Sequence, residues 1–169
     1  MTSAGGPSRR GPEDETAFSD RFAAFGAVRH FPQGTRTAQE AAAAVGCDVA
    51  QICKSLVFRL EESDRPLLVI TSGANRVDTE HVGALLRPHP ARLSKADAAF
   101  VREQSGFAIG GVPPFGWVGA APAVETLVDE DLLGFDVVWA AAGTPNAVFA
   151  IAPAELVERS GARVVRVAR

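Results

Sequence analysis

The sequence predicts a single α+β domain built around a mixed, mostly antiparallel and curled β-sheet with flanking helices. Apolar strand-like runs and capped helical segments both occur, they do not alternate in a strict β–α–β order, and two of the runs are close enough to form a hairpin. At 169 residues and 47% hydrophobic composition, the chain is large enough to bury one core. We expect the domain over residues 16–169. Residues 1–15, rich in Gly, Pro, Ser and charges, are predicted to be a disordered tail.

Two segments near the N-terminus have the spacing or the caps of helices. An aromatic stripe recurs at helical spacing and predicts a first helix over residues 16–28. Thr37 precedes an alanine-rich segment and is followed three residues later by Glu40, which is the pattern of a capping box. Because Gly46 is a typical helix stop, we expect a second helix between Thr37 and Gly46.

A charged residue interrupts the next apolar segment. Residues 52–60 and 66–72 are apolar runs joined by a polar turn and predict a β-hairpin. Alternate side chains of a strand face the same side, and the even-numbered residues of the first run are all apolar except Lys54. Burying an ammonium group without a partner costs several kcal/mol or shifts its pKa. Lys54 is therefore a candidate functional residue.

Two short helices are predicted after the hairpin. Asp78 is placed to cap a helix over residues 79–86, and the Pro-His-Pro segment that follows would end it. Ser94 together with Asp97 predicts the start of another helix, and Gly106 predicts its end.

The C-terminal part of the chain predicts three strands, a helix and a final strand. The three strand-like runs are AVETLV (123–128), FDVVWAAA (135–142) and NAVFAIA (146–152). Pro153 stands in the first turn of the helical segment PAELVERS, and the run ARVVRVA (162–168) ends the chain.

The segment FAIGGVPPFGW, residues 107–117, predicts a loop that is both permissive and stiff. Gly110 and Gly111 can take positive φ and allow a ligand close to the backbone, while Pro113 and Pro114 fix φ and reduce the cost of ordering the loop. Such a loop can direct backbone N–H groups at an oxygen atom. The glycine spacing differs from that of a dinucleotide-binding motif.

Composition excludes several classes of protein. The formal net charge of −3 and the pI of about 5.6 argue against a protein that wraps a long nucleic-acid duplex, although contact with a nucleic-acid end stays compatible. The sequence contains neither a signal peptide nor an apolar run long enough for a membrane span, so we expect a cytoplasmic protein. Cys47 and Cys53 are too few for a disulfide framework or a four-ligand metal set.

Four motifs in a fixed order resemble those of one known family. QICKSLVFR, TSGANRVD, GGVPP and AAGTPNAVFAI follow one another as in the YbaK-like editing domains associated with prolyl-tRNA synthetase, and the resemblance covers roughly residues 30–167. It implies a free-standing hydrolase that removes wrongly attached amino acids from transfer RNA, chiefly tRNA for proline carrying a small residue such as Cys or Ala. It also implies that neither a metal nor a cofactor is needed, and that the acceptor CCA end is the partner, with prolyl-tRNA synthetase as a candidate second partner.

Carried onto this sequence, the resemblance assigns the family's essential lysine to Lys54 and the ends of its Gly-x-x-x-Pro loop to Gly110 and Pro114. The residues inside that loop are Gly111, Val112 and Pro113. We expect Lys54, Gly110 and Gly111 to act in catalysis, and the other three loop residues to contact the substrate.

Further candidates come from position along the chain. Asn75 and Arg76 follow the second hairpin strand, where they would line the mouth of a pocket, and His30 near the start of a strand is another candidate for substrate binding. Phe115 and Trp117 have two interpretations, stacking on the terminal adenine of a single-stranded CCA end or packing in the core.

The residue types suit ester hydrolysis by water. Backbone N–H groups of the glycine loop and the Lys54 ammonium would stabilise an oxyanion, and Lys54 is more useful as a bound cation than as a base. No Ser-His-Asp or Cys-His set is evident, so no covalent nucleophile is predicted. Two alternatives stay open: a non-catalytic module that binds an amino acid or the tRNA end beside a synthetase, and a hydrolase of an unrelated small ester or amide.

Overall fold

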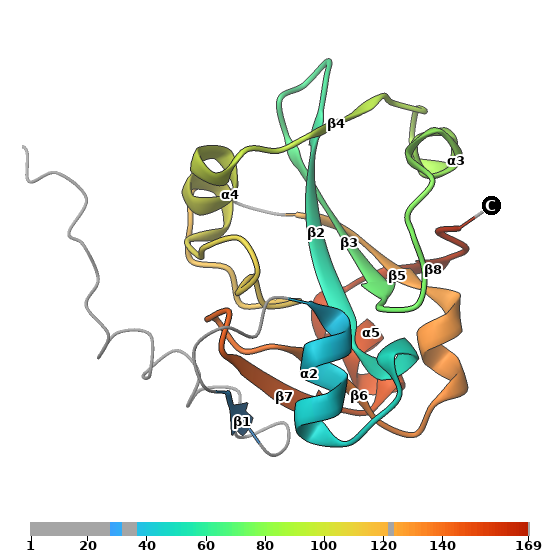
Figure 1. Ribbon diagram of the computed structural model, residues 1–169. Helices are drawn as coiled ribbons and strands as arrows, with labels where there is room; N and C mark the ends of the chain where they lie inside the picture. Colours follow the sequence, from blue (N-terminus) through green and yellow to red (C-terminus); the bar gives the residue numbers. More distant parts are fainter. Residues whose placement is uncertain (1–27, 32–36, 122–123, 169) are drawn as a thin grey trace, which may run out of the picture.

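The computed structural model describes residues 28–31, 37–121 and 124–168, which form two β-sheets and four α-helices (Figure 1). The larger sheet has the strand order β4–β2–β3–β5–β8, and the smaller one has the order β1–β7–β6. The strands are β1 (Val28–His30), β2 (Cys53–Leu60), β3 (Pro66–Ser72), β4 (Leu93–Lys95), β5 (Glu125–Asp129), β6 (Val138–Ala141), β7 (Ala147–Ile151) and β8 (Arg163–Val165). The helices are α2 (Ala38–Val45), α3 (Thr79–Leu85), α4 (Ala98–Ser105) and α5 (Pro153–Ser160), with short 3₁₀ helices η1 (Val49–Gln51) and η2 (Glu130–Gly134).

The strand pairing confirms the predicted class. Strands β2 and β3 form the expected antiparallel hairpin, and β4 pairs antiparallel with β2. Strands β1 and β6 each pair antiparallel with β7, whereas β5 lies parallel to both β3 and β8. The pairing is therefore mixed and mostly antiparallel. It is divided between two sheets that approach each other through a parallel bridge between Ile52 and Trp139.

The predicted caps begin and end the helices. Thr37, Asp78 and Asp97 each accept a hydrogen bond from the backbone N–H three residues further on. Gly46 and Gly106 end α2 and α4 in the left-handed conformation, with φ of 78° and 84°. Each cap satisfies a backbone group that the helix leaves unpaired, which explains why these short helices begin and end at these residues.

Two sequence predictions need correction at their boundaries. Ser94 lies in strand β4, so it does not help to start α4, which begins at Ala98 after the Asp97 cap. Val28 begins strand β1 and is not helical, because its backbone pairs with Phe149 of β7. The rest of the predicted first helix, and the predicted tail over residues 1–15, lie outside the described residues.

Strand β3 is buried along its whole length because both faces of the larger sheet are covered. On one face, Leu68 and Ile70 pack into a core with residues of the smaller sheet and α5, including Phe149. On the other face, Leu67 and Val69 pack with residues of α3. This double burial accounts for the continuous apolar run in the sequence of β3.

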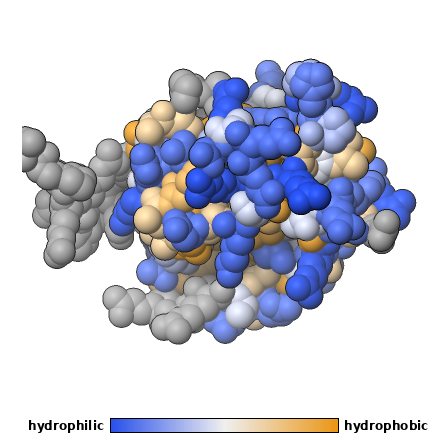
Figure 2. All heavy atoms as spheres, turned by 90° about the horizontal axis from the view of Figure 1, so that it is seen from above, coloured by the Kyte–Doolittle hydropathy of each residue, from blue (hydrophilic) through white to orange (hydrophobic). Residues whose placement is uncertain are grey.

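Hydrophobic side chains are also present at the surface of the molecule. Figure 2 shows mostly hydrophilic side chains on the face seen from above, with one group of hydrophobic ones on the side where α4 lies in Figure 1 and smaller groups elsewhere. Among the described residues, none of the helices has the length and apolar character needed to cross a membrane.

Candidate functional site

The candidate site lies where one edge of β2 has no neighbouring strand. Strand β3 covers the other edge of β2 along its length. On this edge, β4 pairs only with residues 58–60, and within the described residues the smaller sheet pairs only through the Ile52–Trp139 bridge. Within the described part of the chain, residues 53–57 therefore face a gap between the two sheets, which we call the β2 gap.

A pocket of about 430 Å³ fills one end of the β2 gap, and we call it the lysine pocket. Its walls come from the start of α2, from β2, from the end of β6 and the start of β7, and from the glycine loop. The wall includes the predicted residues Lys54, Gly110 and Val112, and beside them Ser55, Ile109 and Pro145. The folded chain thus brings Lys54 and Gly110 together, although 55 positions separate them in the sequence.

The Lys54 ammonium is held at the wall of this pocket by a backbone carbonyl. Lys54 is partly buried, and its Nζ donates a hydrogen bond to the Asn75 carbonyl oxygen at 3.3 Å. Further along β2, Phe58 and Leu60 on the same face pack into the core beside α3, as the alternation of side chains predicts. This hydrogen bond uses one N–H of the ammonium, so the others can still donate to a ligand.

A buried carboxylate fixes the segment that carries this carbonyl. The Asn75 side-chain amide donates to Asp129 Oδ2 at 2.9 Å and to Asp131 Oδ2 at 2.7 Å. Asp129 is 1% exposed, and the same oxygen also accepts from Thr71 Oγ1 at 3.1 Å and from the Ser72 N–H at 3.0 Å. Asp129 therefore ties the end of β3 and the following turn together and indirectly positions Lys54. We call these residues the Asp129 network.

The glycine loop forms a tight turn whose tip enters the pocket. The Gly111 N–H donates to the Ala108 carbonyl at 3.0 Å, and Gly110 has φ of +87°, which are features of a type II turn. Ile109 is 54% exposed at the corner of this turn. Within the described residues, the Gly110 N–H has no hydrogen-bond partner, whereas the Gly111 N–H is already used by the turn.

The other residues of the loop hold its shape. A Cβ at Gly111 would lie only 2.7–2.9 Å from backbone atoms of Thr144 and Pro145, so this position has room for glycine alone. Val112 is buried and lines the pocket. Pro113 and Pro114 are buried and line no part of the pocket, and the Pro113 carbonyl accepts a hydrogen bond from Trp117 Nε1 at 2.9 Å. The structure therefore places both prolines behind the wall of the pocket.

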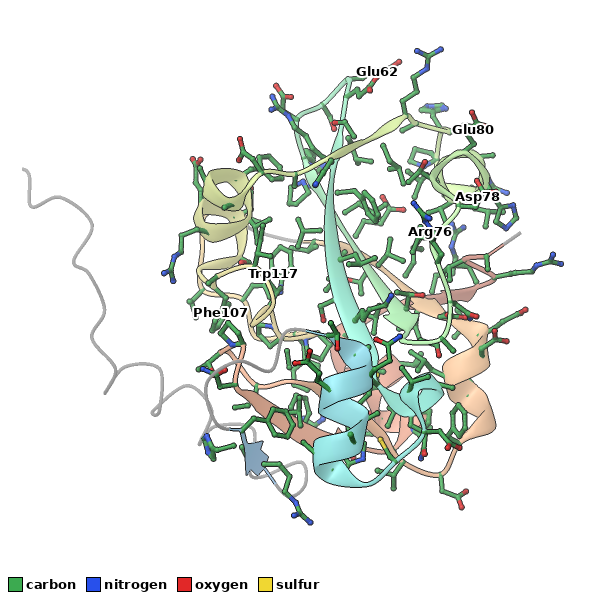
Figure 3. All side chains as sticks on the ribbon, in the orientation of Figure 1. Glu62, Arg76, Asp78, Glu80, Phe107 and Trp117 are labelled. Atoms are coloured by element: carbon green, nitrogen blue, oxygen red, sulfur yellow. The ribbon has the colours of Figure 1, made fainter. Side chains whose placement is uncertain are left out.

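The remaining predicted residues lie outside the lining of the pocket. Arg76 is exposed on the segment between β3 and α3, and Figure 3 shows it on the opposite side of β2 from Phe107 and Trp117. His30 is exposed at the end of β1, and it is the adjacent residue, Phe31, that lines the pocket. The Asn75 side chain is turned toward the two carboxylates, so its backbone carbonyl is the group that serves the site.

The aromatic residues after the loop pack in the interior. Phe115 meets Phe149 edge to face, with 6.0 Å between ring centroids and 77° between ring planes. Trp117 packs against the same core. These contacts agree with the packing interpretation of the two residues.

Cys53 lines the lysine pocket but has the properties of an inert thiol. Burial, and to a smaller extent the negative charge of Asp129, raise the pKa of Cys53 far above its usual range, so the thiol stays protonated. Burial also raises the pKa of Cys47, with a smaller contribution from Asp48. Over the ranges that the structure describes, no three His, Cys, Asp or Glu side chains are grouped in a way that could hold a metal ion.

The comparisons with known sequences agree with these motifs. The sequence model of the family described as "aminoacyl-tRNA editing domain" matches residues 32–158 of this chain. The chain is also similar to the uncharacterized protein YwhH of Bacillus subtilis (strain 168). The two are 33% identical over 137 residues, which is 81% of this chain and 83% of that protein.

Solved structures with the same fold cover nearly the whole chain. One, from work on grafting epitope backbones onto scaffold proteins by computational design, is 39% identical with a TM-score of 0.79 and covers 96% of this chain and 99% of its own. Another, described as "a putative trans-editing enzyme for prolyl tRNA synthetase", is 42% identical with a TM-score of 0.74 and covers 98% of this chain and 99% of its own. The predicted resemblance to the editing family is confirmed, and the chain belongs to the aminoacyl-tRNA editing domain family.

Proposed function

We propose that this protein is a trans-acting deacylase that hydrolyses the ester bond of mischarged aminoacyl-tRNA, with tRNA for proline carrying Cys or Ala as its substrate. The observation that carries the proposal is the meeting of Lys54 and Gly110 in one pocket at the β2 gap. The family supports an editing role, and the 42% identical structure supports prolyl-tRNA as the substrate. Such an enzyme would act in the cytoplasm, where tRNA is charged.

The chemistry assigned to the pocket is attack of water on the ester carbonyl. The attack places negative charge on the carbonyl oxygen, and the tetrahedral intermediate then breaks the bond to the ribose oxygen, which takes up a proton. The Gly110 N–H, which has no partner in the described chain, would donate to the oxyanion. The Lys54 ammonium would contribute its positive charge to the same oxygen or to the ribose.

No covalent intermediate is assigned to the site. The Cys53 thiol is held protonated, and the described residues that line the pocket include neither a carboxylate nor an imidazole that could act as its base. The proton transfers are therefore assigned to water and to groups of the substrate, such as the neighbouring ribose hydroxyl.

The walls of the pocket suit an uncharged side chain on the amino acid. Ala38 and Ala41 of α2 and Ala147 of β7 contribute to the lining, and they present methyl groups with no charge. A wall of this kind accepts a methyl or thiol group, and it discriminates between apolar side chains mainly by size.

A panel of charged tRNAs tests the proposal. We expect wild-type protein to release Cys or Ala from tRNA for proline, and Lys54→Ala to lower the single-turnover rate by at least about 100-fold while the folded structure is retained. Arg102→Ala, which removes an exposed cation on α4, is the matched control and should keep full activity. Equal rates for Lys54→Ala and wild type would exclude Lys54 from the mechanism.

The same assay separates the enzyme from a binding module. A module that only docks beside a synthetase would bind charged tRNA without loss of the ester. Tight binding with no turnover of any charged tRNA would therefore overturn the deacylase and favour the module.

A further inference from the structure

The last described residues of the chain form a segment that runs alongside α3, and we call residues 163–168 the C-terminal strap. Its first part is β8, which pairs in parallel with β5 at the edge of the larger sheet. In Figure 1 the strap, in red, lies below α3. Val167 is completely buried and packs into the same apolar cluster as Val82 of α3 and Leu86 at the end of that helix. The strap is therefore part of the core that supports α3.

Three hydrogen bonds attach α3 to the strap along the length of the helix. The Asp78 N–H, at the start of the helix, donates to the Val167 carbonyl oxygen at 2.9 Å. His81 Nε2 lies 2.9 Å from the Arg166 carbonyl oxygen, which can only accept, so this ring nitrogen is the donor. At the other end, the Arg163 guanidinium donates to the carbonyl oxygen of the last residue of α3. The helix is thus fastened to the strap at its start, in its first turn and at its end.

The residues between β3 and α3 carry the carbonyl that holds the Lys54 ammonium. Asn75, whose carbonyl accepts from Lys54, is only three positions before Asp78. Val77 lies between them in the sequence and packs into the same apolar cluster as the strap. This segment is therefore anchored twice, because the Asp129 network holds Asn75 and the strap holds Asp78.

A lysine held by one hydrogen bond depends on how well the acceptor of that bond is fixed. The bond from Lys54 Nζ is 3.3 Å long, and a lysine side chain has many rotamers of similar energy. An ammonium contributes most to a transition state when it is in place before the reaction. Connecting segments are commonly more mobile than the elements that they join. A second anchor on the segment that carries the Asn75 carbonyl therefore narrows the positions open to the ammonium.

We propose that the C-terminal strap positions Lys54, through the hydrogen bond between Val167 and Asp78 and then through the Asn75 carbonyl. The positioning itself depends only on the fold, whereas its effect on a reaction rests on the proposed function. Val167 is then a positioning residue, since it touches no substrate and holds the segment that holds the ammonium. A site at the start of β2 would thus depend on the last residues of the described chain.

Substitution of Val167 by aspartate should release the end of the strap. A carboxylate is costly to bury without a partner, so Val167→Asp should move this residue out of the core and into water. The residue follows β8 and belongs to no helix or strand, so its release leaves the strand pairing intact. Val164→Asp is the matched control, because it places the same charge on the strap at a residue that is 37% exposed.

The chain has two lysines, which allows a direct view of the ammonium group. They are Lys54 and Lys95, and Lys95 is exposed at the end of β4. NMR of protein labelled with ¹³C at lysine Cε would therefore show two signals, with Lys95 as the internal reference. We expect the Lys54 signal to move toward that of Lys95 in Val167→Asp and to stay in place in Val164→Asp. An unchanged Lys54 signal in folded Val167→Asp would overturn the proposal.

The rate of ester hydrolysis tests the consequence for the reaction. At saturating protein, we expect single-turnover deacylation to be about tenfold slower in Val167→Asp than in wild type, while the protein concentration that gives half the maximal rate changes by less than about twofold. A misplaced catalytic cation lowers the maximal rate without weakening the binding of tRNA. Equal rates for Val167→Asp and Val164→Asp would overturn the positioning role, because the added charge alone would then account for any loss.

A milder pair of variants decides the question if Val167→Asp does not fold. Val167→Ala and Val138→Ala each remove two carbons from a completely buried side chain, but Val138 belongs to the core on the other face of the larger sheet. We expect both variants to lower the urea midpoint of unfolding. Only Val167→Ala should also shift the Lys54 signal and slow deacylation, by about threefold. Equal effects of the two variants on that signal would assign Val167 a merely structural role and overturn the proposal.

The NMR measurement separates this inference from the proposed function. A shifted Lys54 signal in Val167→Asp, in a protein that deacylates no charged tRNA, would leave the positioning in place and overturn the deacylase. Conversely, an active wild type whose rate and Lys54 signal are both unchanged in Val167→Asp would keep the deacylase and overturn the positioning by the strap.

Discussion

At the scale of single residues, Lys54 and Gly110 could be predicted from the sequence and Asp129 could not. Lys54 breaks an apolar alternation, and Gly110 belongs to an unusual Gly-Pro segment, so both carry a local signal. Asp129 ends an apolar run, as many strand-ending carboxylates do, and the side chains that surround it come from positions more than 50 residues away. Only the pairing of β3 with β5 brings these groups together.

The two glycines of the turn should respond differently to substitution. Gly110 has positive φ, but a Cβ added there would have no neighbouring atom closer than 3.7 Å, so Gly110→Ala should cost about 1–2 kcal/mol of stability. Alanine keeps the N–H but disfavours positive φ, so a shift of the turn would misdirect this donor and should lower the deacylation rate by at least about tenfold. Gly111→Ala would push a methyl group into the backbone of Thr144, so it should cost about 3 kcal/mol. Urea unfolding together with single-turnover kinetics measures both effects. A Gly110 variant that loses stability but keeps its rate would assign this glycine a purely structural role.

The thiol of Cys53 should make the folded protein less stable in alkali. Its pKa is raised in the folded state, so the unfolded chain loses this proton first as pH rises. The stabilising effect is complete below the pKa of an unfolded cysteine and declines as pH rises above about 8.5. We expect the free energy of unfolding to fall between pH 8 and pH 10, and to fall less in Cys53→Ala. Equal pH slopes for the two proteins would contradict the buried, protonated thiol.

At the scale of elements, local signals predicted the helices better than the strand pairing. Thr37, Asp78 and Asp97 cap their helices as expected because a cap depends on residues only three positions apart. Ser94 resembled part of a capping box, but pairing with Arg59 of β2 places it in a strand. The parallel pairs that β5 forms depend on partners far away in the sequence, and no local pattern shows them.

The Asp129 network should link the stability of the hairpin end to the activity of the site. In Asp129→Asn, an amide hydrogen would face donors that now point at a carboxylate oxygen, so we expect a loss of about 1–3 kcal/mol of stability. Deacylation should also slow, because the Asn75 carbonyl that holds Lys54 loses its support. Asp131→Asn is the matched control: it changes an exposed carboxylate that contacts the same Asn75 amide.

Thermal unfolding and single-turnover rates of the two variants decide this point. We expect Asp129→Asn to lower both quantities and Asp131→Asn to change each by much less. If both variants behave like wild type, the buried carboxylate neither stabilises the turn nor positions the lysine.

At the scale of the whole molecule, the class of fold followed from the sequence, but the division into two sheets did not. Both sheets use runs with similar apolar character, and the gap between them follows from the short length of β4 and the single Ile52–Trp139 bridge. The gap opens the edge of β2 to the lysine pocket, where the proposed function places the ester. A sequence pattern describes a strand but not the absence of its neighbour.

The overall charge sets the expected mode of tRNA recognition. A net charge of −3 does not favour broad contact with a polyanion, so recognition should rely on the acceptor end and on few phosphates. We expect the logarithm of kcat/KM to fall with the logarithm of salt concentration with a slope no steeper than about −3. A much steeper slope would indicate an extended tRNA interface that the described surface does not suggest.

The most direct measurement is a double-mutant cycle between the two groups that meet in the lysine pocket. Single-turnover deacylation of tRNA for proline charged with Ala would be compared for wild type, Lys54→Met, Gly110→Ala and the double variant. If both groups act on the same ester, the double variant should be little slower than the slower single variant. Fully additive losses, or undiminished rates in both single variants, would contradict a shared catalytic site.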